Sequence, residues 1–238
     1  MKAHQRIIRE ELAKTEESPK VNLSVSDSVV KEISYSEAEQ VILKYEWLGC
    51  MPAIVKYTYG IFFDGVLGGA VVYSTEYSEN LGVWDKYGFT GKMLLLSRGA
   101  CAHWTPKNSA SHLIMKSMAL LPNEYEVITA TVDGLAGEIG TIYQACNFYH
   151  VGVMRKSKTR WGVKVDGKLY GSRAIRSKIG NQRKEAVLEY FKGHDVEFVP
   201  QLSKSRYFLF RGDKRIKRGH LKSIEHLLKP YPKREECT

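Results

Sequence analysis

The sequence predicts an α/β fold in which a mixed, mostly antiparallel central sheet is flanked by helices and followed by a basic carboxyl-terminal extension. Three observations support this prediction. Segments rich in β-branched residues alternate with segments of helical periodicity. The dipeptide Asp64-Gly65 separates two apolar runs, which is the strongest short-range signal of an antiparallel hairpin. Lysine and arginine concentrate in the last third of the chain.

The amino-terminal part is expected to form an arm, one helix and one hairpin. Residues 1–18 are polar and lack a clear apolar stripe, so they are compatible with either a helix or a disordered arm. Residues 36–39, Ser-Glu-Ala-Glu, fit a capping box and begin a helix that runs to about Trp47. Strands over 54–63 and 66–73 then flank the hairpin turn.

The middle of the chain is expected to alternate strands and helices. Residues 93–97 form a third strand, and Asn108 or Ser109 can cap the helix that follows it. The β-branched run 126–132 indicates a buried strand, and residues 141–148 have the length of a short helix.

The basic remainder contains shorter predicted elements. They are strands over 151–155, 160–165 and 207–210, and helices over 172–179, 182–191 and 221–228. The domain organisation that follows is an amino-terminal arm (1–30), a core (31–156) and a basic extension packed on the core (157–238).

Composition excludes several classes of protein. With 43% hydrophobic and 26% charged residues, the 238-residue chain has the makeup of a soluble protein. No apolar run approaches the roughly 18 to 20 residues that a membrane span needs, and the polar start lacks the apolar segment of a secretory signal. We therefore expect a cytoplasmic protein that binds no membrane. The four cysteines are far apart, which favours reduced thiols over disulfides or a zinc site.

Charge is distributed unevenly along the chain. Residues 155–238 carry 23 Lys and Arg against 9 Asp and Glu, whereas residues 1–154 carry 13 against 17. A surface of this charge density attracts polyanions, of which nucleic acid is the commonest in the cytoplasm. Aromatic residues interleaved with the cations, as in 204–208, suit base stacking. The alternative is a solvated basic surface whose aromatics face the core. The candidate DNA-binding residues are Arg160, Lys204, Arg206, Lys214, Arg215, Lys217, Arg218 and Lys233.

The segment 133–147, DGLAGEIGTIYQACN, is the strongest candidate for a reactive site. Asp133 lies at the carboxyl end of a predicted strand, where open α/β sheets place their ligand crevices, and three glycines follow it. Asp133 is a candidate general base or metal ligand, with turn capping as the alternative. Tyr143 is a candidate proton donor or stacking partner for an extruded base, with core packing as the alternative.

Several segments between residues 36 and 152 have a distinctive order and spacing. These are residues 60–68 with the Asp64-Gly65 turn, Leu96-Ser97-Arg98, residues 106–111 (PKNSAS), and Asp133, Gly137, Gly140, Tyr143-Gln144-Ala145 and Asn147. The order of the predicted elements is that of GNAT-type acyltransferases, and these segments together, rather than any one of them, resemble the Mom family of bacteriophage DNA-modification proteins.

The resemblance implies a GNAT-like enzyme that converts adenine to N6-carbamoylmethyladenine in double-stranded DNA and so protects phage DNA from host restriction. In that reaction Asp133 and Tyr143 are the candidate catalytic residues. The candidate substrate-binding residues are Arg98, Asn108, Ser111, Glu138 and Asn147, with helix capping as the alternative for Asn108.

The resemblance also implies iron, for which histidine and carboxylate are suitable ligands. Members of the family often carry His-Tyr where this chain has Glu46-Trp47, and Gly-His where it has Gly137-Glu138. An iron site here would have to use Glu46, Glu138, Asp133 or His103, and the sequence leaves the metal undecided.

A coenzyme A site is disfavoured by the sequence. CoA-dependent GNAT enzymes hold the CoA pyrophosphate with backbone N–H groups of a glycine-rich turn. The corresponding residues 98–108 keep only Gly99, and Pro106 supplies no N–H donor, which argues against acetyl-CoA. Two other functions stay open. One is a CoA-dependent N-acyltransferase acting on a small amine or a protein, and the other is a non-catalytic DNA-binding protein on the same scaffold.

Overall fold

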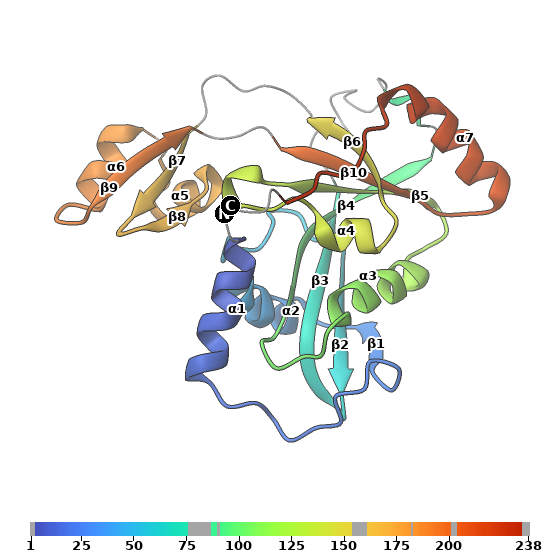
Figure 1. Ribbon diagram of the computed structural model, residues 1–238, viewed down its shortest axis with the longest axis horizontal. Coiled ribbons are helices and arrows are strands. Elements are labelled where there is room, and N and C mark those ends of the chain that lie inside the picture. Colours follow the sequence, from blue (N-terminus) through green and yellow to red (C-terminus); the bar gives the residue numbers. More distant parts are fainter. Residues whose placement is uncertain are drawn as a thin grey trace.

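A seven-stranded sheet forms the centre of the computed structural model, which describes residues 3–75, 87–89, 91–153, 161–181, 183–200 and 204–234 (Figure 1). Its strand order is β1-β2-β3-β4-β5-β10-β6, and every neighbouring pair is antiparallel except β4 and β5. The strands are β1 (Val29–Glu32), β2 (Tyr57–Phe63), β3 (Val66–Ser74), β4 (Lys92–Cys101), β5 (Tyr125–Val132), β6 (Tyr149–Val153) and β10 (Ser205–Phe210). The predicted mixed, mostly antiparallel sheet is confirmed.

Helices cover both faces of this sheet. One face packs against α3 (Ser109–Leu120) and the short α4 (Thr141–Ala145). The other packs against α2 (Tyr35–Tyr45) and α7 (Lys214–Ile224), which continues into the turn η4 (Glu225–Leu227). The amino-terminal arm contains α1 (His4–Thr15), which contacts α2. Within the described ranges, no helix has both the length and the apolarity needed to cross a membrane.

The predicted hairpin is present, and its turn explains why. Asp64 and Gly65 both have positive φ angles, 47° and 80°. A two-residue turn of this kind matches the right-handed twist of the flanking strands, and Asp-Gly tolerates the left-handed conformation at low cost. A second Asp-Gly turn, Asp166-Gly167 at φ 49° and 79°, joins β7 (Trp161–Val165) to β8 (Lys168–Tyr170) in the same way.

The cap of α2 lies two residues before the predicted one. Ser34 accepts a hydrogen bond from the Glu37 backbone N–H at 3.2 Å, and the Glu37 carboxylate accepts one from the Ser34 backbone N–H at 2.8 Å. Ser34 and Ser36 both precede a glutamate by three residues, so the pattern fits either. Ile33 decides between them, because it packs with Ala38 across the helix start as a hydrophobic staple.

Residues 161–200 contain a small unit with its own core. A three-stranded sheet, ordered β8-β7-β9, packs with α5 (Ser172–Ile179) and α6 (Lys184–Tyr190). The bounds predicted for α5 are confirmed, whereas β9 (Val196–Pro200) was not predicted. In Figure 1 this unit extends to one side of the central sheet.

The chain after this unit returns to the central sheet. Strand β10 lies between β5 and β6, with Ser205 opposite Val132 and Phe210 opposite Val127. The boundary predicted at residue 157 therefore does not separate a core from an extension, because an interior strand comes from beyond it.

Two predicted helices have different bounds. The last one was expected over 221–228, but α7 begins at Lys214. Its buried face already includes His220, one turn before the buried Ile224, so the helix starts before residue 221. Helix α4 ends at Ala145 rather than at residue 148, and Asn147 adopts the left-handed conformation at φ 58°.

Candidate active site

Three acidic side chains from separate elements form a cluster at the carboxyl end of β5. Glu46 caps the end of α2, Asp133 follows β5, and Glu138 lies between the turn η3 (Gly134–Ala136) and α4. Glu138 interacts electrostatically with both other carboxylates. Lys204, just before β10, lies 3.3 Å from Asp133 Oδ2 and also interacts with both glutamates. We call these four residues the carboxylate cluster.

Two of these carboxyl groups have strongly raised pKa values. Burial raises the pKa of Glu46 to about 7, against the opposing effects of Arg98 and Lys204. Burial also raises the pKa of Glu138 to about 7, and the neighbouring charges of Glu46 and Asp133 add to the effect. Both groups can therefore take up or release a proton near neutral pH, which suits general acid–base catalysis.

Glu138 is the carboxylate most available to a substrate. Glu46 accepts a hydrogen bond from the Leu48 backbone N–H at 3.0 Å, and Asp133 accepts one from the Leu135 N–H at 3.1 Å. Both are buried. Glu138 is only partly buried and forms no hydrogen bond or ion pair with the part of the chain that the structure describes. Turn capping was the alternative role for Asp133, and this capping bond is present in addition to the place of Asp133 in the cluster.

Tyr143 is the phenol beside this cluster. Burial raises the pKa of Tyr143 above its ordinary value, and the charges of Glu138 and Glu46 raise it further. Its ring packs against Phe148 and Tyr207, with centroids 5.4 and 5.6 Å apart. The side chain therefore contributes to the core and also keeps its hydroxyl proton at any physiological pH. Asp133 and Tyr143 are both neighbours of Glu138.

The glycines of this segment allow the loop to lie close to β10. Gly140 has φ 76°, and a Cβ atom at this position would lie 2.7 Å from Cζ of Tyr207. The Tyr207 hydroxyl donates a hydrogen bond to the Ile139 carbonyl at 2.7 Å. Sequence reasoning did not identify Tyr207 as a support of the site, because only the pairing of β10 with β5 brings it there.

Arg98 positions the site rather than facing a substrate. It is 5% exposed, and its guanidinium donates hydrogen bonds to the Cys50 carbonyl at 2.7 Å and the Ser97 carbonyl at 2.6 Å. Its Nε lies 3.9 Å from Glu46 Oε2. The side chain thus holds the loop after α2 and stabilises the ionised form of Glu46. The predicted direct contact with substrate is disfavoured by this burial.

Three other predicted substrate-binding residues lie outside this network. Asn108 precedes α3 in the left-handed conformation and is exposed, without the side-chain capping bond considered for it. The Ser111 hydroxyl donates to the Asn108 carbonyl at 3.0 Å. Asn147 is exposed after α4. None of the three forms a hydrogen bond or ion pair with the carboxylates in the described ranges.

The candidate iron ligands do not fit a metal site. The residues that the structure describes contain no group of three or more His, Cys, Asp or Glu side chains placed to hold a metal ion. Glu46, Asp133 and Glu138 therefore do not form such a group. Both ring nitrogens of His103 are buried without a hydrogen-bond partner, and its ring lies beside Tyr45.

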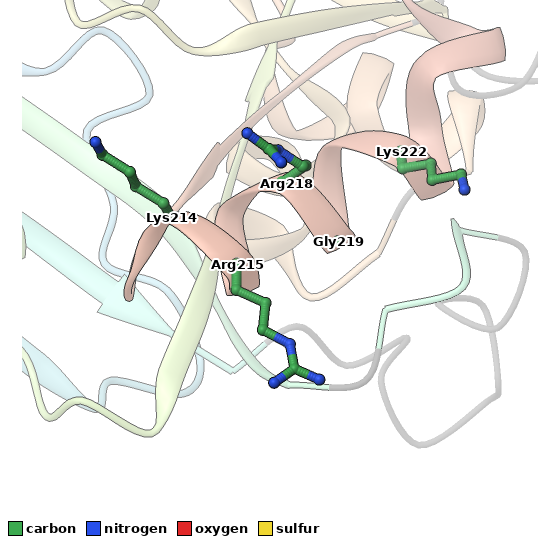
Figure 2. Close-up of a pocket in the computed structure, with 5 residues that line it drawn as sticks. All are labelled: Lys214, Arg215, Arg218, Gly219 and Lys222. Carbon is green, nitrogen blue, oxygen red and sulfur yellow. The ribbon is translucent and has the colours of Figure 1, made fainter.

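Helix α7 presents the predicted cations on its exposed side. Lys214, Arg215, Lys217 and Arg218 are all exposed. Figure 2 shows Lys214, Arg215, Arg218 and Lys222 extending away from the helix, around a shallow pocket of about 440 Å³. The opposite side is anchored by Ile224, which is buried, and by a 2.7 Å contact between the His220 ring and Glu126.

The remaining predicted DNA-binding residues have different surroundings. Arg206 is 1% exposed, and its guanidinium donates to Thr129 Oγ1 at 3.0 Å. Its predicted contact with DNA is wrong, because β10 is an interior strand. Lys204 belongs to the carboxylate cluster, and Lys233 is exposed. Arg160 lies outside the described residues.

Comparison with solved structures finds GNAT acetyltransferases. One from Bacillus cereus is 8% identical, with 78% of this chain and 99% of that chain covered and a TM-score of 0.43. An N-acetyltransferase from Staphylococcus aureus is 11% identical, with 77% and 98% covered and a TM-score of 0.44. An N-acyl amino acid synthase from uncultured soil microbes is 13% identical, with 77% and 90% covered and a TM-score of 0.40. Likenesses at this level carry no argument about activity.

Comparison of the sequence with known families gives a stronger result. No curated protein matches the chain. The model of the Mom protein family, in contrast, matches residues 27–233, from the loop before β1 to the tail after α7. The match covers most of the chain, and the protein therefore belongs to the Mom protein family.

Proposed function

We propose that this protein is a DNA-modifying transferase that adds a carbamoylmethyl group to the exocyclic N6 of adenine and so protects phage DNA from host restriction. The observation that carries the proposal is the state of Glu138. This carboxylate has no hydrogen bond or ion pair with the described residues, its pKa is raised to about 7, and it interacts electrostatically with the partly buried phenol of Tyr143. Membership of the Mom family supports the same reaction.

The reaction needs a base because the exocyclic amine of adenine is a weak nucleophile. As N6 bonds to the electrophilic carbon of the donor, the leaving group departs with its bonding electrons, and N6 must lose one proton. Glu138 accepts this proton. A base with a pKa near 7 is ionised in part of the molecules at neutral pH, yet it still binds a proton well. Tyr143 keeps its proton and is suited to donate a hydrogen bond to the target base or the leaving group.

The cations of α7 supply the affinity for DNA. Phosphate contacts by Lys and Arg release counterions, so they bind the duplex without reading its sequence. The target adenine has to leave the base stack, because its N6 is paired inside the duplex. The carboxylate cluster then receives the extruded base while α7 holds the strand.

Analysis of nucleosides tests the proposal. DNA from cells that express the protein is digested and examined by mass spectrometry, and a deoxyadenosine that carries one carbamoylmethyl group in place of a hydrogen is expected. Glu138→Gln should lower the yield by about 100-fold or more, since general bases contribute roughly 10² to 10⁴ in rate. Glu124→Gln is the matched control, because Glu124 is an exposed carboxylate paired with Lys92.

Two results would contradict the proposal. One is DNA that contains only ordinary nucleosides although the wild-type protein is folded and abundant. The other is a Glu138→Gln variant that modifies DNA as well as the Glu124→Gln control.

A further inference from the structure

A second cationic surface lies where the two ends of the described chain meet (Figure 1). It is a cavity of about 900 Å³. It is lined by Arg6 and Arg9 of α1, Lys107 before α3, Ile139, Thr141 and Gln144 around the start of α4, and Tyr231, Pro232, Lys233 and Arg234 of the tail. We call it the terminal pocket. Five of its ten lining residues are cations and none is acidic.

Hydrogen bonds hold the α1 side of the terminal pocket. The Arg9 guanidinium donates to the Thr105 carbonyl at 2.5 Å and to the His103 carbonyl at 3.2 Å. Gln5 contacts the Tyr45 carbonyl and accepts a hydrogen bond from the Trp47 N–H at 3.1 Å. Helix α1 is thereby attached to the loops after β4 and α2.

Hydrogen bonds hold the tail side as well. The Gln144 amide donates to the Pro232 carbonyl at 3.2 Å and to the Ile139 carbonyl at 3.0 Å. The Tyr231 hydroxyl donates to the Phe148 carbonyl at 2.8 Å. Both sides of the pocket are thus held by hydrogen bonds. Ile139, which lines the pocket, directly follows Glu138 of the carboxylate cluster in the sequence.

Three of the five cations of the terminal pocket have no counter-charge among the described residues. Lys107, Lys233 and Arg234 are exposed, and no carboxylate among the described residues pairs with them. Arg6 pairs with Glu10 at 3.0 Å on an exposed surface, where such a pair contributes little. Like charges gathered without an anion repel one another and raise the local concentration of anionic ligands. The pocket is therefore suited to phosphate groups.

The position of the terminal pocket along the chain favours a nucleic-acid strand over a small ligand. The chain runs from α7 through η4 to the terminal pocket (Figure 1), and Lys229 lies on the segment that connects the two cationic surfaces. Tyr231 is 42% exposed beside Lys233 and Arg234. An exposed ring among cations is the arrangement that grips a strand by its bases and its phosphates together.

We propose that the terminal pocket binds backbone phosphates of the DNA strand that carries the target base. Arg6 and Arg9 of α1 lie outside residues 27–233, which match the family, whereas most of the other lining residues lie within that range. The naming of DNA as the polyanion rests on the proposed function. The binding test below does not require catalysis.

The salt dependence of DNA binding tests the proposal. A fluorescein-labelled 20-base-pair duplex and its single strand are titrated by fluorescence anisotropy at several salt concentrations. The pocket variant Arg6→Ala/Lys107→Ala/Lys233→Ala removes one exposed cation from each of the three segments. It should weaken binding to both probes and lower the salt slope for the duplex by about 2 to 3, at roughly 0.9 per phosphate contact.

Two further variants make the result specific. Lys31→Ala/Lys56→Ala/Lys116→Ala removes the same charge from exposed lysines elsewhere and should leave the slope near that of the wild type. Lys214→Ala/Arg218→Ala removes two cations of α7 and should lower the slope independently of the pocket variant. Thermal melting followed by circular dichroism establishes that each variant is folded.

Several outcomes would overturn the proposal. If the pocket variant has the slope of the lysine control while the α7 variant loses affinity, the pocket proposal fails and the proposed function stands. If the pocket variant loses only binding of inorganic pyrophosphate, measured by calorimetry, the pocket serves a small phosphorylated ligand instead. A wild-type protein without salt-dependent DNA binding would contradict both proposals.

Discussion

Glu46 and Glu138 are held where a neutral side chain would be more stable. Burial raises the pKa of each to about 7, and the charge of Glu46 adds to the shift of Glu138. Lys204 acts in the opposite direction on both pKa values. Groups whose burial and charge are this unfavourable commonly belong to functional sites, where stability is lost to obtain reactivity.

This arrangement makes stability depend on pH in a defined direction. The folded state binds the Glu138 proton more tightly than the unfolded state does, so stability falls as pH rises from about 4.5 to about 7 and then levels. Glu138→Gln removes this loss. Relative to wild type, we expect the free energy of unfolding of this variant to be unchanged at pH 4.5 and higher by on the order of 2 kcal/mol at pH 8. Urea unfolding at both pH values measures it, and an equal gain at both would contradict the raised pKa.

Helix α2 shows how one element supports the site from its far end. Glu46 directly follows the last residue of α2 and begins the next loop. Arg98 holds this loop by donating a hydrogen bond to the Cys50 carbonyl. The direction of the helix is set at its start by the Ser34–Glu37 capping box and the Ile33–Ala38 contact. Stability at the cap is thus connected to the position of a site carboxylate.

The cap gives a prediction with an internal control. Ser34→Ala removes the oxygen that accepts the Glu37 N–H, so it should lower the free energy of unfolding by about 1 kcal/mol. Ser36→Ala changes a first-turn serine that is not the cap and should change stability by less than half as much. Urea denaturation of the two variants compares them. A larger loss for Ser36→Ala would place the helix start where the sequence pattern alone suggested.

At the scale of the whole molecule, β10 joins the basic region to the core. This strand lies between β5 and β6, buries Tyr207 and Phe208, and begins next to Lys204 of the carboxylate cluster. The unit over 161–200 is therefore an insertion between two neighbouring strands of one sheet. The basic region cannot be removed without opening the sheet beside the site.

Truncation tests this organisation. A chain that ends at residue 156 lacks β10, so β5 and β6 lose their shared partner and the cluster loses Lys204. We expect no cooperative thermal unfolding and rapid proteolysis. A chain that ends at residue 234 retains β10 and α7 and should unfold cooperatively. A folded, protease-resistant 1–156 fragment would instead support the independent core that the sequence pattern suggested.

The sequence by itself determined those features whose cause lies in neighbouring residues. The Asp64-Gly65 hairpin, the strand after Glu124 and the bounds of α5 all follow from local preferences. Turn dihedrals, β-branched runs and helical periodicity act over a few residues, so they can be read without knowing the fold.

Only the tertiary structure decided which side chains meet and in what charge state. Arg98 and Arg206 each follow a serine in the sequence and carry no local sign of burial, yet strand position buries them and assigns them to internal hydrogen bonds. Glu46, Glu138 and Lys204 form one cluster because α2, the loop after β5 and β10 converge. Burial and electrostatic interaction depend on neighbours distant in the chain, and the pattern of one segment does not contain them.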